Sequence, residues 1–266
     1  MAIEIVSVIC ARNEARYLEV LVPYLEGQNI NVVLIDNGSE DGSRDLFTPA
    51  RHPNIVRRID LPYEGSFDLT AQLHAKRCAM RETQAEWVIH QDADEILHGP
   101  DGWGRLRECI EAAHTQGFNV MNFNELVMLP ADPDVDDIFA NNKNYYFYEP
   151  RPLRLMRAWK RSANLENIGS GGHVLSGADV YVSPVRMILK HFMVRSRVHA
   201  LKKYMSRTYS RGDREKGWHG KRMNLSAEQL NIPTSAPGLH RLKSVFDAPS
   251  ALPAAVRTHF WDWQPS

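Results

Sequence analysis

Apolar runs alternate with helical periodicity over the first part of the chain. Nearly continuous β-branched stretches at residues 3–10 and 31–35 predict strands that are buried on both faces, since a half-exposed strand would alternate apolar and polar positions. Between them, apolar residues at helical spacing predict a helix over residues 14–26, and Gly27 is a plausible end for it. The chain therefore opens with a strand–helix–strand unit.

The same alternation continues up to an acidic segment. The next predicted elements are a short helix at 42–47, a strand at 54–59, a helix at 67–81 and a strand at 86–91. Strands that alternate with helices indicate an α/β fold with a mostly parallel, doubly wound sheet and right-handed crossovers. Ligands of such sheets bind at the carboxyl ends of the strands, so residues 11–14, 36–39 and 91–95 are expected to meet at one crevice.

The spacing changes in the second half, where the strands are expected to form a meander and the sheet to become mixed. The predicted elements are a helix at 103–115, a strand at 118–123, strands at 145–156, 174–182 and 185–192, and a helix at 198–209. The polar segment 129–144 is expected to be a long loop, either a lid or a disordered excursion. Periodicity fades after Gly212, which predicts one domain over residues 1–212 and an irregular extension over 213–266.

The composition argues against a disulfide-rich, zinc-binding or membrane-anchored protein, and the net charge does not indicate a binding partner. The 266 residues are 43% hydrophobic and 24% charged, with a formal net charge of zero, as in an ordinary globular protein. The three cysteines are too few and too scattered for a disulfide framework or a zinc site, so reduced thiols are expected. No basic region precedes an apolar one at the N-terminus and no apolar window approaches about 18 residues, which predicts a cytoplasmic protein without a membrane anchor.

The chemistry is concentrated in the acidic segment Gln91–Glu95, which follows the apolar run Trp87–His90. On an extended backbone, Asp92 and Asp94 point the same way. Paired hard oxygen ligands suit Mg²⁺ or Mn²⁺, and phosphate oxygens commonly complete the shell of such ions. A phosphorylated substrate is therefore expected. The alternative is a surface turn, in which Asp-x-Asp sequences are common, and only the surrounding sequence distinguishes the two.

Four segments together resemble glycosyltransferases of the GT-A fold, and more narrowly those of family 2. They are Ile9–Glu14, Val33–Ser43, Trp87–Glu95, and Lys190–Phe192 with Arg195–Ser196. The resemblance covers roughly residues 3–212 and implies a nucleotide-binding half over about 1–98 and an acceptor half over about 99–212. It also implies transfer of a sugar from a nucleoside diphosphate sugar, of UDP or GDP type, to an acceptor hydroxyl with Mn²⁺ or Mg²⁺ and inversion at the anomeric carbon.

The resemblance carries further expectations about the pathway. Acceptors of such relatives are often glycans or lipid-linked sugars of surface polysaccharide or lipopolysaccharide. The protein is therefore expected to act at the inner face of a membrane, with peripheral membrane contact at most. The sequence does not indicate an oligomeric state.

The same resemblance implies a set of residues that contact the nucleotide sugar. They are Ala11, Arg12, Glu14, Asp36, Asn37, Ser39, Asp68, Arg77, Gln91, Asp92 and Ala93. Two of them have local alternatives. Asp36 is also well suited to open an Asx turn at Asn37–Gly38, and Glu14 to complement the dipole of the helix that follows it. The sequence departs from many relatives at Cys78, where they have Asn.

The metal ligands and the catalytic base are also implied by the resemblance. Asp94 is the expected principal ligand, Asp92 a second one and His191 the distal one, although a histidine at the end of an apolar strand is often a satisfied core residue. Glu95 is expected to face away if the backbone stays extended. For the base, the resemblance points to the glycine-rich loop that contains Glu166 and His173, which alternatively forms a mobile hairpin.

A basic stretch from Arg186 to Arg222 is interleaved with aromatic residues. The resemblance accounts for Arg195, Lys202 and Lys203 as cations beside the diphosphate, so no nucleic acid is expected as a partner. The terminal Phe260–Trp263 segment either contacts an acceptor or membrane surface or packs back on the domain. Two other functions stay open: a sugar nucleotidyltransferase, although no glycine lies between Cys10 and Glu14, and a non-catalytic binder of nucleotide sugars or polyanions.

Overall fold

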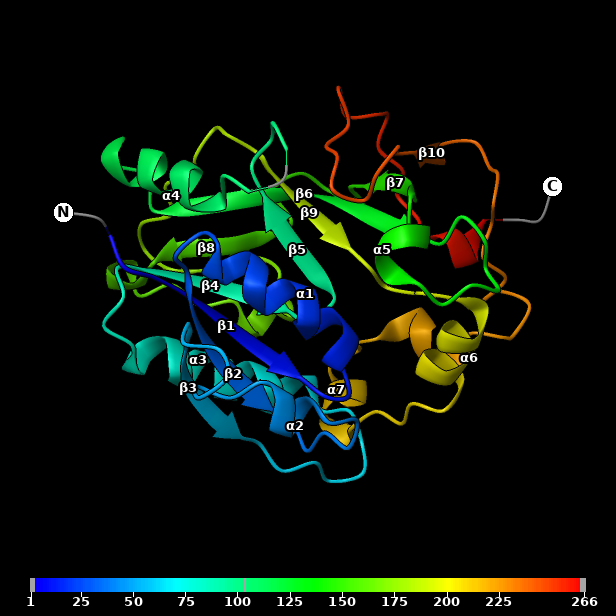
Figure 1. The fold of residues 1–266 in the computed structure, drawn as a ribbon, viewed down its shortest axis with the longest axis horizontal. Coiled ribbons are helices and arrows are strands. Elements are labelled where there is room, and N and C mark those ends of the chain that lie inside the picture. The colour runs from blue at the N-terminus through cyan, green and yellow to red at the C-terminus, as the bar shows by residue number, and fades with distance from the viewer. Residues whose placement is uncertain (1–2, 103, 264–266) are drawn as a thin grey trace.

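The computed structural model describes residues 3–102 and 104–263 and has helices on both faces of a large mixed sheet (Figure 1). The strands are β1 (Ile5–Ala11), β2 (Asn31–Asp36), β3 (Ile55–Asp60), β4 (Trp87–Asp92), β5 (Glu95–His98), β6 (Val120–Leu129), β7 (Asn144–Tyr148), β8 (Met156–Lys160), β9 (Met187–His191) and β10 (His240–Arg241). The helices are α1 (Ala15–Glu26), α2 (Ser43–Leu46), α3 (Leu69–Glu82), α4 (Leu106–Thr115), α5 (Ile138–Asn141), α6 (Arg197–Met205) and α7 (Arg211–Glu215), with short 3₁₀ turns η1 to η4.

The first half of the chain forms the parallel part of the sheet, in the order β3-β2-β1-β4. The register places Ala11 beside Asp36 and Cys10 beside Asp92. Since parallel strands end at the same edge, the three polar loops predicted to converge do so. The α/β fold with a mostly parallel first half, typical of GT-A glycosyltransferases, is confirmed.

The second half adds antiparallel strands, as predicted. β8 pairs with β4 and β6, and β7 pairs with the other part of β6. β9 runs parallel to β6 and carries β5 antiparallel on its other edge. The β5–β9 register sets Glu95 opposite His191, so two segments almost a hundred positions apart in the chain meet at the end of the parallel strands.

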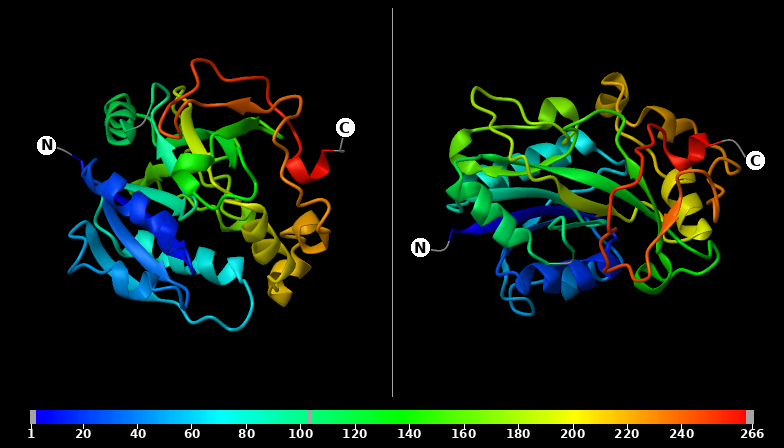
Figure 2. Two further views of the ribbon diagram at one scale, coloured as in Figure 1. Left: turned by 45° about the vertical axis from the view of Figure 1, so that its right-hand side comes forward. Right: turned by 90° about the horizontal axis from the view of Figure 1, so that it is seen from above.

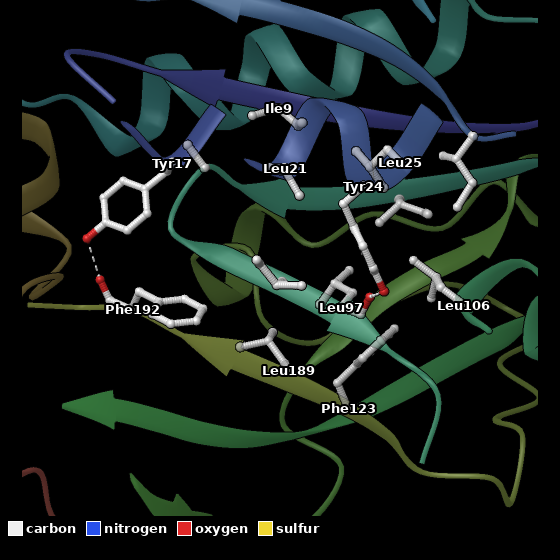
Figure 3. Packing of buried hydrophobic residues seen from close by; sticks show 14 of the residues in the cluster. Ile9, Tyr17, Leu21, Tyr24, Leu25, Leu97, Leu106, Phe123, Leu189 and Phe192 are labelled. Carbon is white, nitrogen blue, oxygen red and sulfur yellow. Dashed lines mark hydrogen bonds between the residues drawn. The ribbon is translucent and has the colours of Figure 1, made fainter. Parts of the chain in front are cut away.

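Helix α1 and helix α4 pack on one face of the sheet, and α3 packs on the other. In the first core, Leu21 and Leu25 of α1 lie among side chains of β5 and β9 (Figure 3). The hydroxyl of Tyr17 donates to the Phe192 carbonyl and that of Tyr24 to the Leu97 carbonyl, both at 2.7 Å. Helix α1 therefore joins the parallel strands to β5 and β9, and burial of each large apolar side chain stabilises this arrangement by about 2 kcal/mol.

The segment beyond residue 212 is bound to the nucleotide half. Asp213 of α7 is fully buried, and its carboxylate accepts from the amides of Leu69 and Thr70 and from the Thr70 hydroxyl, at 2.6–3.1 Å. Asp68 accepts from the Ala71 amide at 2.8 Å, so two carboxylates share the free amides at the start of α3. Figure 1 shows α7 beside α3.

The end of the chain packs on the domain. Phe260 and Trp261 are buried with Tyr146 and residues of α6, and β10 pairs with β7. The two turned views show this last part of the chain running along the β7 side of the sheet (Figure 2). Of the two alternatives for the terminal aromatic residues, packing on the domain is confirmed. The domain boundary at residue 212 stays a prediction.

Two predicted strands were wrong. The strand predicted at residues 145–156 ends with β7 at Tyr148, because Pro150 and Pro152 lack the amides that a sheet needs, and a separate strand, β8, begins at Met156. Residues 174–182 form only isolated bridges, Glu166 with Ser176 and Val120 with Val182. Within the described residues β8 and β6 already have partners on both sides, so no continuous edge is left for a further strand there.

Smaller differences concern element ends. The four-residue strand β5 was missed, β6 extends six residues beyond its predicted end, and the predicted loop 129–144 contains α5. The helix expected from Trp103 begins at Leu106, and Trp103 itself lies outside the described residues. The three cysteines are free, and none of the described helices has the length and apolar composition needed to cross a membrane.

Candidate active site

Asp36 ends β2 with a side chain that is 4% exposed. One carboxylate oxygen accepts from the Ser39 amide, three residues on, at 3.2 Å, and the other has no hydrogen-bond partner among the described residues. That oxygen is available to a ligand donor such as a base imide or a ribose hydroxyl. The nucleotide contact of Asp36 itself stays a prediction.

The side chains around Asp36 hold the two loops together. Arg12 stacks 3.5 Å from the Tyr63 ring centroid and donates to the carbonyls of Asn37 and Gly38. The Asn37 amide donates to the carbonyls of Leu61 and Pro62, and Ser39 Oγ accepts from an amide of the 11–14 loop at 3.0 Å. Arg12, Asn37 and Ser39 therefore shape the crevice through bonds within the protein.

Asp92 lies between two cations at the end of β4. Its Oδ1 accepts from the Lys76 ammonium at 2.6 Å, and its Oδ2 lies 3.6 Å from the Arg157 guanidinium. Burial opposes ionisation of Asp92, but Lys76 and Arg157 outweigh it and lower the pKa of the carboxyl well below its usual range. The carboxylate is still 45% exposed, so it stays ionised with one side open to a ligand.

Glu95 does not face away from this pair. The chain turns at residues 93 and 94, so the backbone is not extended there, and the Glu95 carboxylate pairs with Arg157 while accepting from the Asp92 amide at 3.3 Å. Gln91 is buried, accepting from Ser7 Oγ at 2.8 Å and donating to the Glu95 carbonyl at 2.9 Å. Glu95 and Gln91 therefore stabilise the turn at residues 93 and 94 through bonds within the protein.

Asp94 faces a lysine and a histidine. The Lys203 ammonium of α6 donates to Asp94 Oδ2 at 2.9 Å, and His191 Nε2 lies 3.6 Å from the same oxygen. Although burial raises the pKa of Asp94, Lys203 and His191 lower it well below its usual range. On its far side, His191 Nδ1 is 2.6 Å from Glu125 Oε1, so Glu125 fixes the ring with Nε2 toward Asp94.

The Asp94–His191 pair has features that fit a divalent metal ion. A histidine ligand commonly donates its other ring nitrogen to a carboxylate, as His191 does to Glu125. Mg²⁺ is often held by only one or two protein groups, with phosphate oxygens and water as the remaining ligands. Across residues 3–102 and 104–263, however, no three His, Cys, Asp or Glu side chains group around one point as a metal site, and Asp92 faces Lys76 and Arg157. The three-residue ligand set stays a prediction.

The two candidate bases have different surroundings. Burial and the guanidinium groups of Arg157, Arg154 and Arg222 lower the pKa of His173 well below its usual range, so its imidazole is neutral. Glu166 instead pairs with Arg77 at 3.0 Å, beside a small pocket under α3. Neither Glu166 nor Arg77 forms an ion pair with Asp92 or Asp94. Both roles stay predictions, as do those of Asp68, which caps α3, and of Ala11 and Ala93, which are buried.

Further cations lie on the α6 side of the crevice. Arg207 stacks 4.6 Å from Phe67 and has no acidic partner among the described residues, whereas Arg195 pairs with Asp136 at 3.2 Å. Burial raises the pKa of Glu14 to about 7, with Asp94 adding to the rise and Lys203 and Arg207 opposing it. Helix α6 and the residues after it therefore present positive charge opposite the carboxylates.

Sequence reasoning missed Lys76, Arg157 and Glu125, which fix the orientation of Asp92, Glu95 and His191. A signal was present for two of them. Glu125 and Arg157 are charged residues within otherwise largely apolar strands, which is costly unless partners are present.

The first part of the chain is similar to a known protein family. Residues 7–122 match the model of glycosyl transferase family 2. This segment is similar to the glycosyltransferase domains of that family. The resemblance seen in the sequence is thereby confirmed over these residues. No curated protein matches the sequence.

Solved structures of glycosyltransferases align over much of the chain. Residues 1–349 of S. aureus TarS in complex with UDP-GlcNAc align with a TM-score of 0.47 and 9% identity, over 86% of this chain and 76% of that one. S. aureus TarS in a longer form aligns with a TM-score of 0.44 and 10% identity over 84% of this chain, which spans only 45% of that protein. The galactosyltransferase LgtC, in complex with donor and acceptor sugar analogs, aligns over 35% of this chain and 39% of its own, with 16% identity and a TM-score of 0.26.

Proposed function

We propose that this protein transfers a sugar from a nucleoside diphosphate sugar, of UDP or GDP type, to a hydroxyl group of a glycan or lipid-linked acceptor. One observation carries the proposal: Asp36, Asp92 and Asp94 gather at the carboxyl edge of the sheet, with the cations of α6 facing them. A nucleoside diphosphate needs acceptors for its base and ribose and positive charge for its phosphates, and this edge offers both.

Each carboxylate has a distinct role in the proposal. Asp36 would accept from the base or the ribose through its free oxygen. Asp92, kept ionised by Lys76 and Arg157, would accept from a ribose hydroxyl through its exposed side. Lys203 and Arg207 would compensate the charge of the diphosphate.

Mn²⁺ or Mg²⁺ is part of the proposal, held by Asp94 and His191 in the orientation that Glu125 gives to the imidazole. When bound, such an ion neutralises the charge that develops on the departing diphosphate. Glu125 and Lys203 then act through position and charge: Glu125 keeps the histidine in one tautomer, and Lys203 keeps Asp94 ionised.

Direct displacement with inversion requires a base for the acceptor hydroxyl. His173 is proposed for this role, because its imidazole is neutral and the carbonyl of the preceding Gly172 accepts from Arg157, which also faces Asp92. The cations around His173 oppose formation of the imidazolium, so His173 accepts a proton best when an anion is bound close by. Work on a surface polysaccharide or lipopolysaccharide at the inner face of a membrane completes the proposal.

A thermal-shift panel tests the donor. UDP, GDP, CDP and dTDP sugars are added with and without Mn²⁺ to the wild type, Asp36→Asn and the exposed control Asp179→Asn. One nucleotide class should stabilise the wild type, by about 2.7 kcal/mol at a hundred times its Kd. Asp36→Asn should lose most of this gain and Asp179→Asn none. Absence of stabilisation by any donor, or full stabilisation of Asp36→Asn, would contradict the proposal.

A further inference from the structure

A second cation beside the candidate site, in addition to Arg207, lacks an acidic partner among the described residues. Arg222, in the turn η3 (Gly220–Asn224), is partly buried and forms no ion pair with any described residue. Its guanidinium lies 5.9 Å from the centroid of the Trp261 ring. The preceding residue differs: Lys221 is exposed and pairs with Asp262 at 2.8 Å. Partial burial without a counterion is unfavourable for Arg222 unless a ligand supplies the negative charge.

A stack of rings connects Arg222 to a second arginine. The His259 ring centroid lies 4.5 Å from that of Trp261 and 3.9 Å from that of Tyr148. The Arg154 guanidinium lies 5.0 Å from the Tyr148 ring centroid. Tyr148 ends β7, and the rings that follow it come from the end of the chain, which lies beside β7 (Figure 2). The stack restricts both guanidinium groups, so less entropy is lost when they bind an anion.

The charges around this stack do not balance. Arg154 pairs with Glu125, but the same carboxylate also bonds His191. Arg157 is already paired with Glu95 and lies near Asp92. Arg222 is therefore the uncompensated charge, and its field, together with those of Arg154 and Arg157, acts on the His173 imidazole.

This surplus overlaps only in part with the cations assigned to the donor. Lys203 and Arg207 act on Asp94 and Glu14, at the end of the crevice nearest to α6. Arg222 and Arg207 both act on Tyr209 and His219, but Arg222 is the one of these three cations with a leading effect on Arg154 and His173. If the diphosphate of the donor binds at Lys203 and Arg207, then Arg222 and Arg154 are left to contact the acceptor.

We propose that the acceptor carries an anionic group, a carboxylate or a phosphate, and that Arg222 binds this group next to His173, with Arg154 behind it. The proposal rests on the proposed function, since it names the acceptor class of the same site. A guanidinium binds both anions through paired hydrogen bonds, which also orients the sugar that bears them. The bound anion lowers the cost of protonating His173 and so couples acceptor binding to proton transfer.

Binding of three simple probes tests the proposal. Methyl β-D-glucuronide, glucose 6-phosphate and neutral methyl β-D-glucoside are titrated at low salt into the full chain saturated with the donor's nucleoside diphosphate. The variants are Arg222→Met, Arg222→Lys and the adjacent control Lys221→Met, which removes the same charge from an exposed pair. One of the anionic probes should bind the wild type at least about tenfold more tightly than the neutral one, and which one does so distinguishes carboxylate from phosphate.

Arg222→Met should remove this preference, Arg222→Lys should retain part of it, and Lys221→Met should keep it. Equal binding of charged and neutral probes to the wild type, or equal losses in Arg222→Met and Lys221→Met, overturns the proposal. The nucleoside diphosphate itself should bind Arg222→Met with unchanged Kd, and a marked loss would assign Arg222 to the donor and overturn the proposal too. Failure of the wild type to bind any nucleotide is a different result, which contradicts the proposed function.

Discussion

The Lys203–Asp94 pair offers the sharpest test of the candidate site. The two side chains are only 10% and 12% exposed, and Lys203 also donates to the Met193 carbonyl at 3.1 Å. Lys203→Met keeps most of the apolar stem and removes the ammonium, which leaves His191 Nε2, at 3.6 Å, as the remaining side-chain partner of the Asp94 carboxylate among the described residues. Breaking a buried pair in this way typically costs about 3–5 kcal/mol, because one charge stays buried without its partner.

The structure favours the lower end of that range. At 2.9 Å, with an effective dielectric constant of about 20, the attraction between the two charges is about 6 kcal/mol before desolvation. His191 Nε2 stays 3.6 Å from Asp94 when the ammonium is removed, so Asp94 keeps one polar neighbour and we expect a loss of about 3 kcal/mol in the free energy of unfolding. The neighbour Lys202 is exposed, and Lys202→Met should change it by less than about 0.5 kcal/mol.

Urea unfolding in EDTA measures the loss of stability in Lys203→Met, and urea unfolding in Mn²⁺ measures the competition between Lys203 and a metal ion for Asp94. In EDTA, Lys203→Met should be destabilised and Lys202→Met should match the wild type. Because Lys203 and a metal ion would share Asp94 Oδ2, Mn²⁺ alone should bind Lys203→Met more tightly, and at a hundred times its Kd should restore about 2.7 kcal/mol. Equal stability of the two lysine variants in EDTA would refute the energetic argument, and no greater effect of Mn²⁺ on Lys203→Met would refute the competition.

Three further substitutions test other parts of the structure. Asp213→Ala should lower the free energy of unfolding by about 3 kcal/mol, because it leaves two amides of α3 without partners, and hydrogen exchange should accelerate first at that helix end. The folded-state pKa of Glu14 is about 7, above its ordinary 4.5, so between these pH values the folded chain binds more protons than the unfolded chain. The free energy of unfolding therefore falls as pH rises from 4.5 to 7, and Glu14→Gln should remove this slope in urea titrations. Gly38→Ala would bring a Cβ within 3.0 Å of Tyr63 Cβ and should cost more than Gly65→Ala, where φ is also positive but no atom lies within 4 Å; equal unfolding midpoints would show that the contact relaxes freely.

The sequence was informative where structure depends on local pattern. The strands of the parallel half were predicted to within one or two residues, because β-branched runs and the turns that end them are local features. The convergence of the 11–14, 36–39 and 91–95 loops followed from the topology alone and is confirmed by the pairing of Ala11 with Asp36 and Cys10 with Asp92.

The remaining errors arose where partners are distant in sequence. Strand β5 has only four residues and is stabilised by β9, so nothing in its own sequence separates it from a loop. Residues 174–182 have the composition of a strand but meet β6 only at its first residue, through the single bridge of Val182 with Val120. The contact of Glu125 with His191 spans 66 positions, beyond the reach of any periodicity.

A charged residue inside an apolar strand indicates from sequence alone that the side chain has a polar partner. Its role can be assigned only once that partner is known. Glu125, Arg157 and Lys190 are all buried within strands, and each is costly to bury alone. Glu125 and Arg157 orient His191 and Asp92, so they serve the crevice. Lys190 is equally buried, yet its ammonium donates to the carbonyls of residues 245 and 247 at 2.6 Å and fastens the end of the chain to β9. The same pattern thus serves a site in two cases and an anchor in the third, and only the identity of the partner, an ionisable side chain or a backbone carbonyl, separates them.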